Sequence, residues 1–419
     1  MLAVVSESMG LPQNGLSSQQ QQQLYLPRRL GGLQVVRATT LVPLARAAAL
    51  MRHGPALRDT IASWGLVDSD GAPCDPSELD GVGSDGGKDL LHLLSERGVA
   101  PLSGKGCPEP GSIQASDPLR PRVPPARLLS ALLSSAADSA FANLLSTSSP
   151  ADRIRLLSAG GASAGASLTA PLSNDGVHFS DWQWAEALGW RLGVRTPGPG
   201  SLCKNQKESG EACQAVLDDG QDHAVDCPCG PLRNRRHDDI AEVYADILEE
   251  CGALCRREVF VPEFSSKKEA WLDVWAYGLH DLPDLLLDIT VRHPRAARYR
   301  PASETLPGAA AAHSEHAKQD RYPPAGGRSV WPVAYESWGR AGADAERLLM
   351  HLVATARRRA HRRGRASGQE LARWRARIDG VLQRGVVAQL VAARQGLPGR
   401  RPYRPRPLDL SALEAGSPV

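Results

Sequence analysis

Two aspartates in the second half of the chain are of the residue type that binds the metal ions used to cleave phosphodiester bonds. Asp288 lies inside LLLDITV, an apolar run typical of a buried strand, and Asp273 lies inside LDVWAYG, where apolar and polar residues alternate. A buried ionised carboxylate costs several kcal/mol unless a cation or hydrogen-bond donors compensate it. Because adjacent strands lie about 5 Å apart, both carboxylates could bind one divalent cation, Mg²⁺ or Mn²⁺, which prefers oxygen ligands.

Lys318 and Glu336 are the candidates that would complete such a site. The cation would polarise a phosphodiester and lower the pKa of its bound water. Lys318, in HAKQDRY on an expected helix, would orient the attacking water or stabilise negative charge on the phosphate. Glu336, in VAYESWG, would either join the metal ligands or form a hydrogen bond at the end of a strand. In the structural alternative, the first aspartate caps a turn and Asp288 pairs with Arg292 or Arg295.

A group of cysteines with one histidine indicates a second metal site. Four of the eight cysteines fall within residues 203–229, and thiolates with an imidazole in a tetrahedral set favour zinc. The pattern C-x9-C-x9-H-x3-C gives the predicted ligands as Cys203, Cys213, His223 and Cys227, with Cys229 and His237 as alternatives. Zinc would stabilise a stretch with few apolar residues of its own. In the other interpretation, these residues are free thiols in a mobile loop.

Arginines crowd the last third of the chain, where they could contact the phosphates of nucleic acid. The densest run is ARRRAHRRGRA (356–366), and RWRARID (373–379) follows it. The predicted contact residues are Arg357, Arg358, Arg359, Arg362 and Arg363. The alternative is a solvated helix face. Trp374 would either stack on a base or belong to the core.

From residue 237 onward, the hydrophobic pattern predicts an α/β domain. Helical periodicity and strand-like alternation or continuous apolar runs follow in the order helix, three strands, helix, strand, helix. The expected helices cover 237–251, 309–322 and 343–360. The expected strands cover 257–263, 269–278, 285–291 and 329–339.

The other segments have compositions that predict a partly disordered, mostly helical N-terminal region. In chain order, the expected parts are a disordered Gln/Ser leader (1–24), a helical segment (25–65), a flexible low-complexity loop (66–125), a helical region (126–195), a zinc knuckle (200–236), the α/β domain (237–360), and an Arg-rich helix with a disordered tail (361–419). Within the helical region, Ser180 is expected to cap a short helix, and the small residues GGASAGASL are expected to form a linker.

Composition narrows the class of protein. No apolar run is long enough to span a bilayer, and the first residues lack the basic and apolar regions of a secretory signal. The eight cysteines in 419 residues do not form a disulfide framework. We therefore expect a reducing compartment, nucleus or cytoplasm, with no membrane partner, no secretion and no small-molecule cofactor.

Several of these motifs together resemble the C-terminal region of non-LTR retrotransposon polyproteins. The similar segments are GQDHAVDC, NRRHDDIAEVYADIL, LDVWAYG, DLLLDITV, HAKQDRY and VAYESWG, which cover about 180–356, and more weakly RRLGGLQVVRATTLVPLARAAALM within 25–65. The resemblance implies a zinc knuckle before a restriction-like endonuclease of the PD-(D/E)XK superfamily, whose mixed sheet is flanked by helices. Asp273 would be the aspartate of the PD motif, Asp288 the second acid and Lys318 a lysine shifted onto the following helix.

The sequence departs from that family in three ways. Leu272 replaces the proline of the PD motif, and Ile289 and Thr290 replace the usual ending after the second acid. The 25–65 segment resembles the region after a polymerase palm. However, no polymerase active site is found: the candidate pair of adjacent aspartates, in AVLDDG, lies between the predicted zinc ligands and not in a strand hairpin. We expect a Mg²⁺-dependent DNA endonuclease from a truncated or degenerate retrotransposon, which also binds the RNA of that retrotransposon. The alternatives are an inactive nucleic-acid-binding relic of the same fold and a protein-interaction module.

Overall fold

The computed structural model describes residues 15–33, 125–170, 178–194, 200–207, 209–218, 220–265, 268–279, 282–362, 369–396 and the strand 408–409. The chain divides into two compact units. The first consists of 1–24, 28–33 and 148–419, and the second of 25–27 and 34–147. The expected loop 66–125 lies outside the described residues apart from its last position, and so does most of the predicted 25–65 segment. No described helix is both long enough and apolar enough to cross a membrane.

In the second unit, the described helix is α5 (Pro125–Thr147). It agrees with the helix expected from ARLLSALLSSAADSAFANLLS. The rest of this unit lies outside the described residues, apart from the short stretch 25–27.

The glutamine run near the N-terminus is helical, which corrects the prediction of a disordered leader for its last part. It forms α2 (Ser18–Tyr25), and the 3-10 turn η1 (Arg28–Leu30) follows. The buried amide of Gln23 donates to the carbonyls of Gly31 (2.9 Å) and Arg191 (3.1 Å). Glutamine tolerates helices well, and here its amide satisfies buried backbone carbonyls that would otherwise lack a donor.

The helical region before the cysteines has its termini fixed by side-chain caps. Ser149 caps α6 (Pro150–Ala159), and Ser180 forms a capping box with Gln183 at α7 (Asp181–Leu192), as the sequence predicted for Ser180. Between these helices, η3 (Ala166–Thr169) lies in the segment expected to be a linker. Ser163, Ala164 and Ala166 are instead buried there.

The sheet is mixed, and its order is β4-β3-β2-β1-β5. Its main strands are β1 (Leu254–Phe260), β2 (Trp271–Tyr277), β3 (Leu285–Arg292) and β4 (Val330–Glu336). The first three pair antiparallel, and β3 and β4 pair parallel. The crossover between β3 and β4 carries α10 (Arg300–Ser303) and α11 (Ala309–Arg321), because parallel neighbours need a long connection. The short β5 (Leu408–Asp409) pairs parallel with β1.

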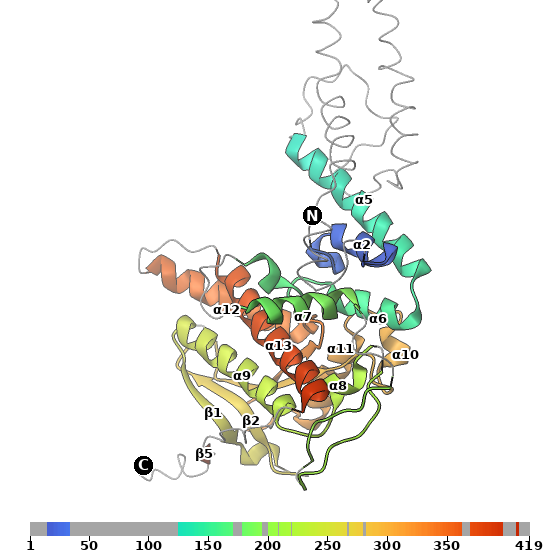
Figure 1. Cartoon of the computed structure of the whole chain (residues 1–419). Coiled ribbons are helices and arrows are strands. Elements are labelled where there is room, and N and C mark those ends of the chain that lie inside the picture. The colour runs from blue at the N-terminus through green and yellow to red at the C-terminus, as the bar shows by residue number, and fades with distance from the viewer. Residues whose placement is uncertain are drawn as a thin grey trace, which may run out of the picture. The chain divides into compact units, whose positions relative to one another are not determined.

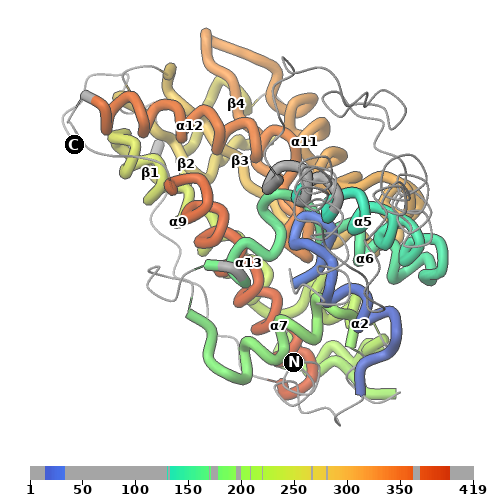
Figure 2. The backbone as a smooth tube through the Cα atoms, turned by 90° about the horizontal axis from the view of Figure 1, so that it is seen from above, coloured from blue at the N-terminus to red at the C-terminus, as the bar shows by residue number. Residues whose placement is uncertain are grey.

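Helices cover both faces of this sheet, which confirms the expected α/β class. On one face, α9 (Leu232–Cys251) and α12 (Ala343–Arg362) form the main core with alternate strand residues such as Val274 and Leu287. On the other face, Leu286 packs with Tyr322, the residue after α11. Figure 1 shows α9 in front of β1 and β2, and in Figure 2 both α11 and α12 lie close to β4.

The last helix, α13 (Glu370–Gln395), belongs to the core and packs along α9. Trp374 is buried, so the prediction of a core residue is the one that holds. The arginines of RWRARID are engaged in ion pairs with acids of α9 and α12, which corrects their assignment to a nucleic-acid surface. The pairs include Arg377–Asp246 (2.6 Å), Arg375–Glu346 (2.5 Å) and Arg373–Glu250.

The turn after β4 depends on a glycine that α13 approaches closely. Asp379 of α13 is buried and accepts hydrogen bonds from the amides of Gly165 (3.1 Å) and Ser167 (3.0 Å). Gly339 has a φ of 102°. A Cβ on it would lie 2.6 Å from Asp379 Oδ1 and 3.1 Å from the Cα of Ala164. The close approach therefore excludes a side chain here as firmly as the backbone conformation does.

We expect Gly339→Ala to lower the free energy of unfolding by about 1–3 kcal/mol or more, because a strained backbone and a collision with a buried carboxylate add together. Gly327→Ala is the matched control, since its φ of 73° is also positive but nothing lies near its added Cβ. Urea denaturation of both variants measures the difference. Equal losses would mean that contact with Asp379 has no effect.

Candidate active site and metal centre

The two candidate aspartates lie opposite each other where β2 and β3 separate. The strands pair through Val274↔Leu287, and Asp273 and Asp288 are the next residues in the same register. Beyond this point the amide of Ile289 donates to Asp273 Oδ2. A side-chain oxygen therefore serves as the acceptor for a β3 amide at the place where strand pairing stops. The two carboxylates lie close enough that the charge of Asp273 raises the pKa of Asp288.

Lys318 reaches this position from α11, as the sequence predicted. Its ammonium group forms an ion pair with Asp288 Oδ1. Tyr322, one helical turn later, has its hydroxyl hydrogen-bonded to the same carboxylate. Arg292 instead donates to Ser314 Oγ (2.9 Å) and Arg295 pairs with Asp222 (3.1 Å), so the alternative of an Asp288–arginine pair is wrong.

His237 contacts the other aspartate. Its Nε2 lies 3.2 Å from Asp273 Oδ2 and 3.1 Å from the carbonyl oxygen of Ile289. Its Nδ1 lies 3.1 Å from Asp238 Oδ1. Burial alone would lower the pKa of His237, but the charges and hydrogen bonds of Asp273 and Asp238 outweigh it and raise the pKa to about 10.

The two carboxyl groups differ in their proton affinities. Burial acts to raise the pKa of Asp273, but His237, the Ile289 amide and Lys318 outweigh it, and the pKa is lowered. Burial raises the pKa of Asp288 although Lys318 opposes the shift, and the nearby charge of Asp273 raises it further. Asp288 is therefore a buried acid whose ionised form is only partly compensated, which is the condition that a divalent cation relieves.

Glu336 does not belong to this group: of its two expected roles, that of a metal ligand is wrong and that of a hydrogen bond at the end of a strand is confirmed. It is buried at the end of β4, where it accepts a hydrogen bond from the Ala310 amide in the first turn of α11 (3.0 Å). Lys318 lies eight residues further along that helix, which corresponds to about 12 Å. The carboxylate of Glu336 thus satisfies free amides at the start of α11, far from Asp288.

Sequence reasoning missed His237 and Tyr322 as members of the site. His237 was considered only as an alternative zinc ligand, although it shares a helical stripe with Ile240 and Tyr244 at spacings of three and seven residues, which places it toward the sheet. Tyr322 follows Lys318 by four residues and therefore lies on the same side of α11.

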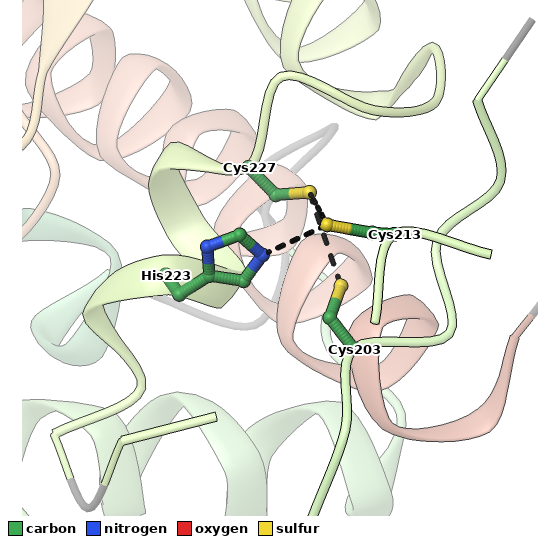
Figure 3. A group of neighbouring side chains, drawn as sticks. All are labelled: Cys203, Cys213, His223 and Cys227. Carbon is green, nitrogen blue, oxygen red and sulfur yellow. Dashed lines mark hydrogen bonds between the residues drawn. The ribbon is translucent and has the colours of Figure 1, made fainter. Parts of the chain in front are cut away.

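The predicted zinc ligands come together in one cluster. The ligand atoms of Cys203, Cys213, His223 and Cys227 all lie within 4.8 Å of one another, and Figure 3 shows their side chains converging. The Sγ atoms of Cys203 and Cys227 are 3.8 Å apart, and those of Cys213 and Cys227 are 3.9 Å apart. Tetrahedral zinc with Zn–S bonds of about 2.3 Å places sulfur atoms about 3.8 Å apart. The donor set and its spacing therefore fit a closed structural zinc site.

Backbone pairing and one acidic cap position these ligands. The amide of Cys203 donates to the carbonyl of Ala215 (2.8 Å), which holds two ligand segments side by side. Asp218 accepts from the amides of Asp222 (2.9 Å) and His223 (3.0 Å) at the start of α8 (Asp222–Asp226). Asp218, the first aspartate of AVLDDG, therefore holds the backbone of the predicted ligand His223 in place.

The alternative ligands are not part of this cluster. His237 lies at Asp273, and the fourth member is Cys227 rather than Cys229. Cys251 and Cys255 contact backbone carbonyls of Leu352 and Ala245 (both 3.6 Å), in agreement with their expected packing role.

The predicted nucleic-acid arginines lie at the C-terminal end of α12. Arg357 and Arg358 are exposed. Arg358 contacts Thr355 Oγ1 (3.1 Å), and Arg359 reaches the carbonyl of Glu250 (3.4 Å). Arg362 is the last residue of α12, and Arg363 lies outside the described residues. The exposed members provide positive charge beyond the ion pairs that join α9 and α13.

Comparisons with known proteins give the chain no family. No protein-family model matches it, and a search of curated proteins found no relative.

We expect the purified chain to contain one zinc ion and Cys227→Ser to lose it, because three ligands hold zinc far less tightly than four. The same variant should unfold at a lower temperature, since metal binding contributes directly to folding. Elemental analysis and thermal melts measure both effects. Cys255→Ser removes a half-buried thiol outside the cluster and should keep the zinc. A wild-type chain that stays metal-free after refolding with zinc would contradict the assignment.

Proposed function

We propose that residues 232–362 form a metal-dependent endonuclease domain that nicks DNA. The observation that carries this proposal is the convergence of Asp273, Asp288 and Lys318 at the point where two strands separate. The order of one helix, three antiparallel strands, a helical crossover and a parallel fourth strand also supports it. This is the arrangement expected for a restriction-like endonuclease of the PD-(D/E)XK superfamily. The resemblance to non-LTR retrotransposon proteins gives DNA as the substrate.

The residues of the site have separate tasks in this proposal. The carboxylates of Asp273 and Asp288 would hold Mg²⁺ or Mn²⁺, which polarises the phosphodiester and activates a water. Lys318 holds a positive charge against Asp288 and is available to the negative charge that develops on the phosphate. Tyr322 restricts the rotation of the Asp288 carboxylate through its hydroxyl. The zinc knuckle and the arginine-rich end of α12 would hold the nucleic acid.

A second candidate function is an inactive, zinc-containing nucleic-acid-binding domain of the same fold. One observation favours it: His237 and Lys318 place a basic group against each of Asp273 and Asp288. Such a network can persist as a structural ion-pair cluster after catalysis is lost.

We expect the full chain to nick supercoiled plasmid with Mg²⁺ or Mn²⁺ and Asp288→Asn to be slower by about 100-fold or more, since each ~1.4 kcal/mol of lost stabilisation slows a reaction tenfold. Asn keeps the shape but removes the charge that binds a cation. Asp320→Ala alters an exposed acid on the same helix as Lys318 and should nick normally. Salt-sensitive DNA binding without any nicking by the wild type would favour the inactive domain.

We expect Arg357→Ala combined with Arg358→Ala to weaken DNA binding for all sequences and to lower the slope of log affinity against log salt by about 2, because each lost phosphate contact reduces it by about 1. Arg373→Ala removes an arginine that is paired with Glu250, so the salt slope should stay unchanged. Fluorescence anisotropy at several salt concentrations measures both. Identical slopes in the double variant and the wild type would place the DNA elsewhere.

A further inference from the structure

His237 connects three elements at the candidate active site. It lies near the start of α9, and its imidazole contacts Asp273 of β2, the backbone of Ile289 in β3, and Asp238 of its own helix. The side chain is 32% exposed, so the ring lies at the edge of the site rather than deep in the core. From the sequence, His237 was expected only as an alternative zinc ligand. Its position against Asp273 indicates a different role.

The groups around the imidazole determine which of its ring nitrogens donate hydrogen bonds. Nε2 faces two oxygen acceptors, on Asp273 and Ile289, and Nδ1 faces the carboxylate of Asp238. Carboxylate and carbonyl oxygens accept hydrogen bonds, so both ring nitrogens must donate. An imidazolium donates its Nδ1–H to Asp238 and shares its Nε2–H between Asp273 Oδ2 and the Ile289 carbonyl. Its planar ring fixes the two donors on opposite edges and so sets the distance between α9 and the strands.

The hydrogen bonds to Asp273 are unevenly distributed over its two oxygens. Oδ2 receives both the Ile289 amide and the His237 ring. Within the described part of the chain, no hydrogen bond to Oδ1 is present beside them. Arg257 reinforces the arrangement, because it donates to the Asp273 carbonyl (3.0 Å) and pairs with Glu242 of α9 (2.5 Å). The carboxylate is thus held by one oxygen, and its orientation is fixed.

We infer that His237 is a positioning residue that holds Asp273 by Oδ2 and directs Oδ1 toward the divalent cation. This inference rests on the proposed endonuclease function, since the cation is the one that Asp273 and Asp288 would share. Outer residues that orient a metal-binding carboxylate affect metal affinity and activity by about 10–100-fold. Loss of the ring should therefore act on metal dependence more than on DNA binding.

The test compares His237→Ala and His237→Gln in the zinc-loaded full chain. Nicking is followed against Mn²⁺ concentration, and Mn²⁺ binding is measured directly by calorimetry. We expect His237→Ala to raise the Mn²⁺ midpoint and weaken Mn²⁺ binding by about tenfold or more, with DNA affinity within about twofold of the wild type. His237→Gln should recover part of this, because its amide still donates one hydrogen bond. His316→Ala, an exposed histidine on α11, is the matched control.

The outcomes separate this inference from the proposed function. If the wild type nicks and His237→Ala has the same Mn²⁺ midpoint, the inference is wrong and the function stands, even when the variant melts at a lower temperature. If the wild type binds Mn²⁺ without nicking and His237→Ala binds it more weakly, the inference stands and the nuclease is wrong. A wild type that neither nicks nor binds Mn²⁺ overturns both.

Discussion

The structure around the candidate active site is governed by the burial of two neighbouring carboxylates. Asp273 and Asp288 lie opposite each other in adjacent strands, and two ionised acids at this distance are unfavourable unless positive charge lies beside them. The fold supplies that charge from both faces of the sheet, His237 from α9 and Lys318 from α11. Both helices are therefore required in their observed positions, and the separation of β2 from β3 creates the space in which they meet the carboxylates.

The zinc cluster is joined to the sheet rather than attached as a separate module. Asp222, next to the histidine ligand, contacts His293 (3.0 Å) and Arg295 (3.1 Å) just beyond the end of β3. Gln389 of α13 donates to the carbonyl of Val225 (2.9 Å) within the same short helix, α8. Because α9 begins only five residues after Cys227, the position of the Cys3His cluster restricts where that helix, and with it His237, can lie.

The abundance of arginine serves two different purposes in this chain. Those of α13 form ion pairs with acids on α9 and α12, and they hold a long helix against the core through partly buried contacts. Those at the end of α12 include exposed residues and remain the candidates for phosphate contacts. Two arginine-rich segments therefore differ in role because acidic side chains of neighbouring helices contact the arginines of α13, whereas the end of α12 includes exposed arginines. Arg155 and Arg191 are a further case, since both are buried and donate to backbone carbonyls.

The sequence alone determined the elements from 237 onward and the neighbouring strand positions of Asp273 and Asp288, because strand alternation, helix periodicity and the fixed strand spacing are local rules. Lys318 was expected beside them as the usual companion of such acids, and its contact with Asp288 is a tertiary one. It also determined the four zinc ligands, since their types and order restrict the chemistry. Only the tertiary structure decided the role of Glu336, which depends on where α11 begins, and the partner of His237, which lies 36 residues away in the chain. It likewise showed that the small-residue segment before α7 is buried against Asp379. These are long-range contacts between polar groups, whose pairing depends on how the elements pack and leaves no periodic signal in the sequence.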